Sequence, residues 1–246
     1  MANLDQDSLD AALASGKLRD VSVEGCHIET AAGVETVNVT FAETSFRQAD
    51  LAGASFCDCV FLACTFRSAS LTDCRFDGCR FYDGESDRSC DFSYADLRRC
   101  RFDHCDLTTA KFPSVRAFGI ELIACQASGA DFGNADFGMG TGTFYSATFD
   151  ACNLAYADFS RTNLTECVFT GSRLPHASFN DAVLERADLS GAALEGIEGR
   201  NLVLIGADLR GATFNNLNPR EMDLTGVRVD PEQGLVLLQA MGIRVE

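Results

Sequence analysis

The stretch ADLAGASFCDCVFLACTFRSASLTDCRF, residues 49–76, carries leucine or phenylalanine at every fifth position. The same period begins at Phe41 and continues, with interruptions, almost to the end of the chain; Phe118 is the one phenylalanine that falls outside it. A helix repeats near 3.6 residues and a flat strand repeats every two, so neither produces a period of five. Such a fixed short period is typical of proteins built from stacked repeats.

Each five-residue repeat reads as a short strand followed by a turn. In Ala95-Asp96-Leu97 the small residue and the leucine face inward, while the aspartate between them faces solvent. The next two residues turn a corner, and four repeats close a coil of about twenty residues whose strands stack in parallel about 4.8 Å apart. We therefore expect an all-β, quadrilateral β-helix over residues 21–229, an N-terminal capping segment at 1–20, and a C-terminal helix and tail at 230–246.

Twelve cysteines occur in the chain, and their positions argue against disulfides or a metal site. All except Cys57 occupy the small inward position of the repeat, where cysteine replaces alanine as a small apolar group. We predict that these are free, buried thiols: Cys26, Cys59, Cys64, Cys74, Cys79, Cys90, Cys100, Cys105, Cys125, Cys152 and Cys167.

The net charge of −16 is partly built into the repeat. Ten aspartates stand between the small residue and the leucine or phenylalanine, which predicts rows of carboxylates on flat faces. These rows either keep a rod soluble or present regular negative charge to a protein that normally grips DNA. Direct binding of nucleic acid is disfavoured because phosphate contacts need a basic face.

Neither a membrane segment nor a signal peptide is apparent in the sequence. No apolar run reaches the roughly 18 residues needed to span a bilayer. Residues 1–10 carry acids rather than a basic region followed by an apolar stretch. We therefore expect a cytoplasmic protein with no membrane association.

The first interruption of the period lies at residues 82–89. Phe81 and Phe92 are eleven residues apart instead of ten, which suggests one inserted residue in a polar, glycine-containing segment. Such a segment is expected to bulge from a corner of the coil. Loops on a rigid scaffold often carry binding function, although a tolerated surface insertion accounts for the pattern equally well.

A second interruption lies at residues 138–143. The spacing from Phe137 to Phe144 suggests two inserted residues, and three glycines give this segment conformations closed to other residues. A further irregularity, from Ile28 to Phe41, falls in the first coil.

Both ends of the chain predict short helices. Asp7-Ser8 followed by Leu9, Ala12 and Leu13 reads as a capped helix over the first coil. Asp230-Pro231-Glu232-Gln233 resembles a capping box with proline at the first helical position. The helix that follows is apolar nearly all round, so we expect one side to seal the last coil and the other to form a two-fold homodimer. The predicted dimer interface comprises Leu235, Val236, Leu238 and Met241.

An enzyme is not expected. His27, His104 and His176 are scattered along the rod at outward or corner positions. The sequence offers no nucleophile–base pair and no spacing typical of metal ligands. We predict no catalytic residue, no cofactor and no metal.

Several segments that depart from the plain repeat point to one family. Residues 79–95, 119–122, 128–132 and 153–160 resemble the Qnr quinolone-resistance branch of the pentapeptide-repeat proteins, whose fold is a right-handed quadrilateral β-helix. The C-terminal segment is also similar to that of the branch. The resemblance implies a DNA-mimicking homodimer that binds the type II topoisomerases DNA gyrase and topoisomerase IV and relieves their inhibition by quinolones.

The resemblance also implies which loops bind the partner. In the family the first loop is needed for protection and the second contributes to it. The corresponding residues here are Asp83, Gly84, Glu85, Ser86, Asp87, Arg88 and Ser89 in the first loop and Met139, Gly140 and Thr141 in the second. The alternative is a pentapeptide-repeat scaffold that interacts with a different, unknown protein partner.

Overall fold

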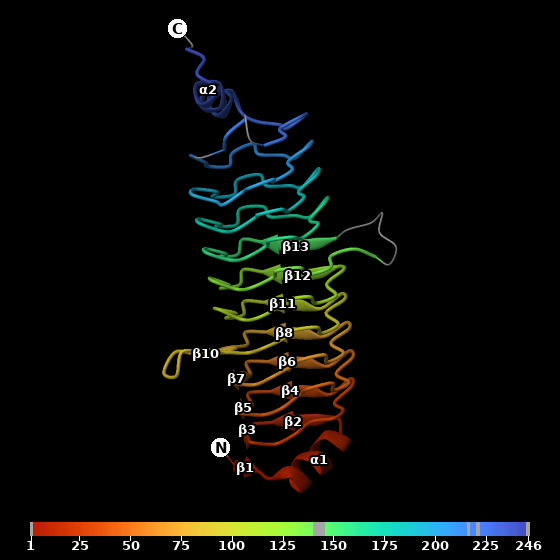
Figure 1. Cartoon of the computed structure of the whole chain (residues 1–246). Helices are drawn as coiled ribbons and strands as arrows, with labels where there is room; N and C mark the ends of the chain where they lie inside the picture. Colours follow the sequence, from red (N-terminus) through yellow and green to blue (C-terminus); the bar gives the residue numbers. More distant parts are fainter. Residues whose placement is uncertain (1, 140–145, 216, 220–221, 245–246) are drawn as a thin grey trace.

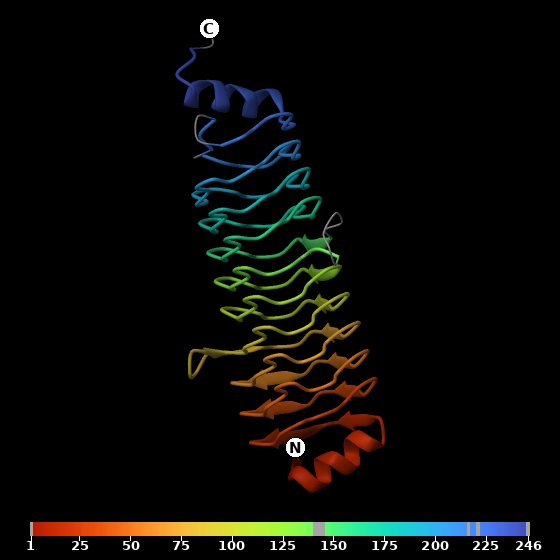
Figure 2. The same ribbon diagram turned by 45° about the vertical axis from the view of Figure 1, so that its right-hand side comes forward.

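A computed structural model describes residues 2–139, 146–215, 217–219 and 222–244. The chain forms a rod of stacked coils that starts at one end and finishes at the other (Figures 1 and 2). Its strands are β1 (Ala2–Leu4), β2 (Lys17–Arg19), β3 (Val21–Glu24), β4 (Glu35–Val37), β5 (Thr40–Ala42), β6 (Ser55–Cys57), β7 (Val60–Leu62), β8 (Arg75–Asp77), β9 (Tyr82–Asp83), β10 (Arg88–Ser89), β11 (Arg101–Asp103), β12 (Ile120–Ile123) and β13 (Ala147–Asp150). The helices are α1 (Gln6–Ala14) and α2 (Pro231–Ala240).

Four parallel ladders make the four faces of the rod. Face 1 contains β2, β4, β6, β8, β11, β12 and β13, and face 2 contains β1, β3, β5 and β7. Face 3 starts at the bridge of His27 with Ser45, and face 4 starts at the bridge of Thr30 with Asp50. Single-residue bridges continue all four ladders toward the C-terminus, so the predicted quadrilateral β-helix is confirmed.

The core is a column of stacked side chains. Phenylalanines of successive coils lie face to face, as in the series Phe56, Phe76 and Phe102, whose ring centroids are 4.8 Å apart. Phenylalanines of adjacent faces meet edge to face, for example Phe76 and Phe81 at 5.3 Å. Offset stacking and edge-to-face contact are the two favourable aromatic geometries, and each adds about 0.5–1.5 kcal/mol to the burial itself.

The predicted free thiols lie in this core. The eleven cysteines at the small inward position are buried, and Cys57 is partly exposed. Burial raises the pKa of Cys74 and Cys167 to about 12, because a thiolate is poorly solvated there. These cysteines therefore pack as small apolar groups.

The outward aspartates have a structural role that the sequence pattern did not reveal. All ten accept a hydrogen bond from the backbone N–H two residues further on, as Asp131 does from Gly133 at 2.8 Å and Asp158 from Ser160 at 2.8 Å. The carboxylate thereby closes the turn at the corner. The complete set is Asp50, Asp91, Asp96, Asp106, Asp131, Asp136, Asp158, Asp188, Asp208 and Asp223.

Both insertions are longer than the spacing of phenylalanines suggested. Ser45 pairs with Thr65, 20 positions on, but Thr65 pairs with Asp91, so six residues are inserted rather than one. Glu121 pairs with Thr148, 27 positions on, so the second insertion is seven residues rather than two. Phe92 is the next inward phenylalanine after Phe81, and Phe149 is the next one after Phe137 among the described residues. The sequence count wrongly placed one more repeat within each insertion, and this made both insertions look five residues too short. Phe144, counted as part of the period, lies outside the described residues.

Helices cover both ends of the rod. α1 lies beneath the first coil, and its N-cap is Asp5, which accepts from the Ser8 N–H at 3.0 Å, rather than the predicted Asp7 or Ser8. Face 1 begins at Lys17, earlier than residue 21. At the other end, Asp230 N–H donates to Gln233 Oε1 at 2.7 Å, and Gln233 Nε2 donates to the carbonyls of Leu209 and Ala212. Gln233 thus anchors α2 on the last coil.

Neither helix of the described chain has the length and apolar character needed to cross a membrane.

Candidate protein-interaction site

The first insertion forms a small antiparallel hairpin that projects from the rod (Figure 1). Asp83 pairs with Arg88 and Tyr82 with Ser89, and residues 84–88 are exposed. The sequence predicted a bulging loop here but not the strand pairing. A one-residue insertion is too short for a hairpin, whereas six extra residues provide two strands and a turn.

Hydrogen bonds within the hairpin fix its tip. Asp83 accepts from the Ser86 hydroxyl and from the Glu85 N–H at 3.1 Å, and these bonds lower the pKa of Asp83. The Tyr82 hydroxyl donates to Asp87 at 2.8 Å, which raises the pKa of Tyr82 because the bond favours the protonated phenol. The hairpin therefore presents its acids in a defined arrangement.

Two contacts anchor the hairpin to the rod. Arg88 Nη2 donates to Glu43 at 2.9 Å, and Ser89 Oγ donates to the Thr109 carbonyl at 2.7 Å. Beside the hairpin lies an open groove of about 510 Å³, lined from the rod by residues of face 3 that include Thr65, Asp91 and Lys111. The hairpin and face 3 therefore form one continuous polar surface.

The second loop is described only in part. Met139 is 58% exposed, whereas Gly140 and Thr141 lie outside the described residues. Counting along the ladders, the first insertion falls between faces 2 and 3, and the second between faces 4 and 1. The two insertions thus belong to diagonally opposite corners of the coil.

The carboxylate rows expected from the sequence are interrupted by basic residues. On face 4, Asp96 lies beside Arg116 at 2.6 Å, and on face 1 Asp208 contacts Arg210 and Arg228 at 2.7 and 3.0 Å. The hydrogen bond from Arg210 and the nearby positive charges lower the pKa of Asp208 to about 2. Alternating charge reduces the repulsion that adjacent carboxylates in a parallel ladder experience.

Most of the ten outward aspartates nevertheless remain unneutralised. Seven of them form no ion pair with any described residue: Asp50, Asp106, Asp131, Asp136, Asp158, Asp188 and Asp223. Asp131 and Asp158 are neighbours on face 3, and Asp136 lies on face 4. Asp131, Asp136 and Asp158 therefore place unneutralised negative charge on faces 3 and 4 in the middle of the rod.

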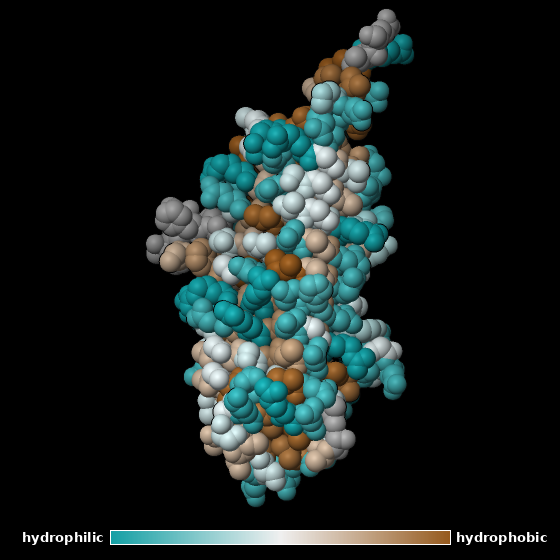
Figure 3. Space-filling model, turned by 180° about the vertical axis from the view of Figure 1, so that it is seen from behind, coloured by the Kyte–Doolittle hydropathy of each residue, from teal (hydrophilic) through white to brown (hydrophobic). Residues whose placement is uncertain are grey.

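The C-terminal helix leaves apolar side chains at the surface. The four predicted interface residues, Leu235, Val236, Leu238 and Met241, are 36–43% exposed, and no residue of α2 is buried. Brown patches mark apolar surface toward this end of the rod in Figure 3.

The histidines do not gather at a reactive site. Across the ranges that the structure describes, histidine, cysteine and carboxylate side chains form no group of three that could hold a metal ion. His104 Nδ1 forms a hydrogen bond with Asp103 at 2.6 Å, and the His176 ring stacks on Tyr156 with a centroid distance of 5.1 Å.

This architecture defines a parallel β-solenoid of five-residue repeats carrying a hairpin at one corner. The family model "Pentapeptide repeats" matches this chain in eight copies. The matched residues are 40–81, 88–116, 144–181, 162–198 and 203–229. Structures of QnrB1, described as a plasmid-mediated fluoroquinolone resistance protein, superpose along nearly the whole rod. The trypsin-treated form has a TM-score of 0.76 and 31% identity, covering 94% of this chain and 100% of QnrB1. The full-length form has a TM-score of 0.74 and 33% identity, covering 90% and 100%.

Curated relatives agree over a shorter span. The quinolone resistance pentapeptide repeat protein QnrB96 of Scandinavium goeteborgense is 35% identical over 55% of this chain, and QnrB4 of Escherichia coli is 37% identical over 35%. The chain spans about half the length of these relatives, 55% of QnrB96 and 42% of QnrB4. The chain belongs to the pentapeptide-repeat family, and within it to the Qnr-type proteins.

Proposed function

We propose that this chain binds the type II topoisomerases DNA gyrase and topoisomerase IV and protects them from quinolones. The observation that carries the proposal is the likeness to QnrB1 along 94% of the chain, at 31% identity. QnrB1 and QnrB96 are both described as quinolone or fluoroquinolone resistance proteins, and QnrB1 has the same fold as this chain. No catalytic group is needed for this function, because protection follows from binding.

DNA mimicry is the proposed mode of binding. A rod with a net charge of −16 is complementary to a basic DNA-binding surface. The seven unpaired aspartates supply charge at positions that the repeat fixes along the rod. Such charges steer association and set its salt dependence.

The hairpin is proposed to contact the topoisomerase next to the quinolone-binding site. It stands away from the coil, carries Asp83, Glu85 and Asp87, and is held in shape by its own hydrogen bonds. A preorganised loop loses little conformational entropy on binding. Met139, Gly140 and Thr141 of the second insertion are proposed to add to this contact from the opposite corner.

A homodimer is the proposed assembly, and the cytoplasm the proposed location. The exposed Leu235, Val236, Leu238 and Met241 of α2 are apolar residues that a second copy would cover. A two-fold pairing of the C-terminal ends would place one hairpin on each arm of a longer rod.

Equilibrium binding to purified gyrase tests the proposal. In the test variant a short Gly-Ser turn replaces residues 83–88, and Ser89 is kept so that its bond to Thr109 remains. Glu43→Gln is the matched control: the hairpin variant also loses the exposed Arg88–Glu43 ion pair, which contributes little by itself, and this substitution removes that pair alone. We expect the hairpin variant to bind gyrase more weakly, the control to bind normally, and both affinities to fall steeply with added salt. Gyrase binding that ignores salt would argue for an unrelated mode of contact.

A further inference from the structure

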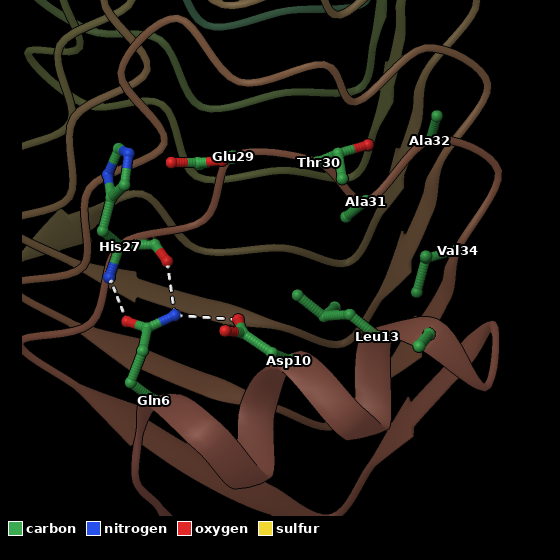
Figure 4. A pocket seen from close by; sticks show the side chains of 10 residues that line it. Gln6, Asp10, Leu13, His27, Glu29, Thr30, Ala31, Ala32 and Val34 are labelled. Carbon is green, nitrogen blue, oxygen red and sulfur yellow. Dashed lines mark hydrogen bonds between the residues drawn. The ribbon is translucent and has the colours of Figure 1, made fainter.

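A hollow of about 640 Å³ lies at the N-terminal end of the rod (Figure 4). α1 forms one wall with Gln6, Asp10 and Leu13, and the first coil forms the other with residues 27–34. Its volume falls in the range of about 300–1,000 Å³ that is usual for ligand sites.

The hollow faces Thr30, the first residue of the face 4 ladder. We call such a ladder position a rung, and this rung pairs with a strand on one side only. Higher on face 4, Asp50 uses its N–H to bind the Glu29 carbonyl and its carbonyl to accept from the Ala31 N–H, both at 2.9 Å. The backbone N–H and carbonyl of Thr30 point away from Asp50, toward the side on which no earlier coil lies. Neither group has a hydrogen-bond partner among the described residues. Thr30 therefore offers a donor and an acceptor at the spacing that an extended segment requires.

The neighbouring face shows how such a rung is covered. On face 3, the side-chain amide of Gln6 replaces the missing strand. It accepts from the His27 N–H at 2.9 Å and donates to the His27 carbonyl at 2.8 Å (Figure 4). The first rung of face 3 is thus satisfied within the chain, while the first rung of face 4 is open.

The inward positions beside Thr30 carry unusual residues. Where the coils above have Ala49 and Ala69, the first coil has Glu29, and where they have Leu51 and Leu71, it has Ala31. Glu29 is exposed in the hollow, whereas those alanines and leucines are buried. The first coil therefore lacks apolar volume at one inward position and adds a negative charge at the other.

We propose that this hollow binds an extended segment of a partner protein with the pattern basic–any–apolar, added to face 4 as a parallel strand. The carbonyl of the basic residue accepts from the Thr30 N–H, and the N–H of the apolar residue donates to the Thr30 carbonyl. The basic side chain lies between Glu29 and Asp10, and the apolar side chain fills the space beside Ala31 and Leu13. This second binding site does not depend on the topoisomerase proposal.

The probe is the capped peptide acetyl-Arg-Ser-Leu-amide, titrated into the full-length ¹⁵N-labelled chain and followed by amide chemical shifts. We expect saturable shifts centred on residues 29–33 and slower hydrogen exchange at the Thr30 N–H. N-methylation of the peptide leucine removes one hydrogen bond and should weaken binding roughly three- to tenfold. Replacing the peptide arginine with glutamate should abolish measurable binding, because it places three carboxylates together.

Variants of the chain separate binding from folding. Thr30→Pro removes a backbone donor that has no hydrogen-bond partner among the described residues, at an edge position where proline is tolerated, so the fold should be kept while the peptide binds at least three- to tenfold more weakly. Thr30→Ala is its matched control and should bind normally. Asp10→Asn combined with Glu29→Gln removes both charges, while the side-chain carbonyl at position 10 can still accept the hydrogen bond from Gln6 Nε2, and should weaken binding of the peptide several-fold.

Three results would overturn the proposal. One is the absence of saturable shifts at residues 29–33 up to millimolar peptide. Another is equal affinity for the N-methylated peptide. The third is a shift at Thr30 that follows protein concentration instead of peptide concentration, which would assign the hollow to a second copy of this chain.

Discussion

Charge and fold can be separated in this rod by replacing aspartate with asparagine. The perturbation is the sevenfold change of Asp50, Asp106, Asp131, Asp136, Asp158, Asp188 and Asp223 to asparagine, which takes the net charge from −16 to −9. Each corner bond survives, because the asparagine side-chain carbonyl accepts equally well. Asn163 already does so, accepting from the Thr165 N–H at 3.0 Å. The variant should therefore fold as the parent does.

The expected loss of gyrase affinity follows from where these charges lie. One adjacent pair of faces can enter a groove at a time, and faces 3 and 4 together hold five of the seven: Asp50, Asp131, Asp136, Asp158 and Asp223. An exposed ion pair changes an equilibrium about two- to threefold, so five give roughly a 30- to 240-fold weaker complex. The salt dependence of binding should become shallower for the same reason.

The assay is a binding titration against gyrase at several salt concentrations, with circular dichroism and thermal unfolding as fold controls. Asp131→Ala provides the contrast, because it also removes the bond to the Gly133 N–H. We expect it to lose about 0.5–1.5 kcal/mol of stability, the net value of one hydrogen bond. A sevenfold asparagine variant that is folded and binds gyrase like the parent would refute the charge argument.

Three further predictions concern the rod itself. Phe102→Ala leaves a cavity between Phe76 and Phe112, and urea titration should show a loss of about 3–5 kcal/mol, whereas an unchanged midpoint would contradict the stacked core. Deleting residues 231–246 should give monomeric or insoluble protein by light scattering, and an intact dimer would place the interface elsewhere. Asp208 has its pKa lowered from 3.8 to about 2, so its contribution to stability is complete above pH 3.8 and is lost as the pH falls toward 2. Asp208→Asn should lack that part of the acid dependence in pH-jump unfolding.

Much of the fold could be predicted because one repeat is read many times. An inward position that recurs every five residues is insensitive to any single substitution, so the faces, the buried cysteines and the outward aspartates all followed from the period. The size of the insertions did not follow from the period, because the spacing between phenylalanines cannot distinguish inserted residues from a repeat without leucine or phenylalanine. The pairings of Thr65 with Asp91 and of Glu121 with Thr148 reveal the extra residues.

The candidate sites were less accessible from sequence for a physical reason. A residue at the end of a ladder differs from an internal one because it lacks a neighbouring strand on one side. The residue type does not reveal that the strand is absent. The amide of Gln6 on His27 and the open rung at Thr30 therefore appear only in three dimensions. The second signal, Glu29 and Ala31 at inward positions, is visible in the sequence once the register of the first coil is known.

Supercoiling by DNA gyrase at an inhibitory ciprofloxacin concentration tests the central claim most directly, with the intact protein titrated in and the hairpin variant run in parallel. The account predicts that the intact protein restores supercoiled product in a concentration-dependent manner, and that the variant lacking residues 83–88 does not. A folded, intact protein that restores no supercoiling at any concentration would contradict the claim, as would full protection by the variant.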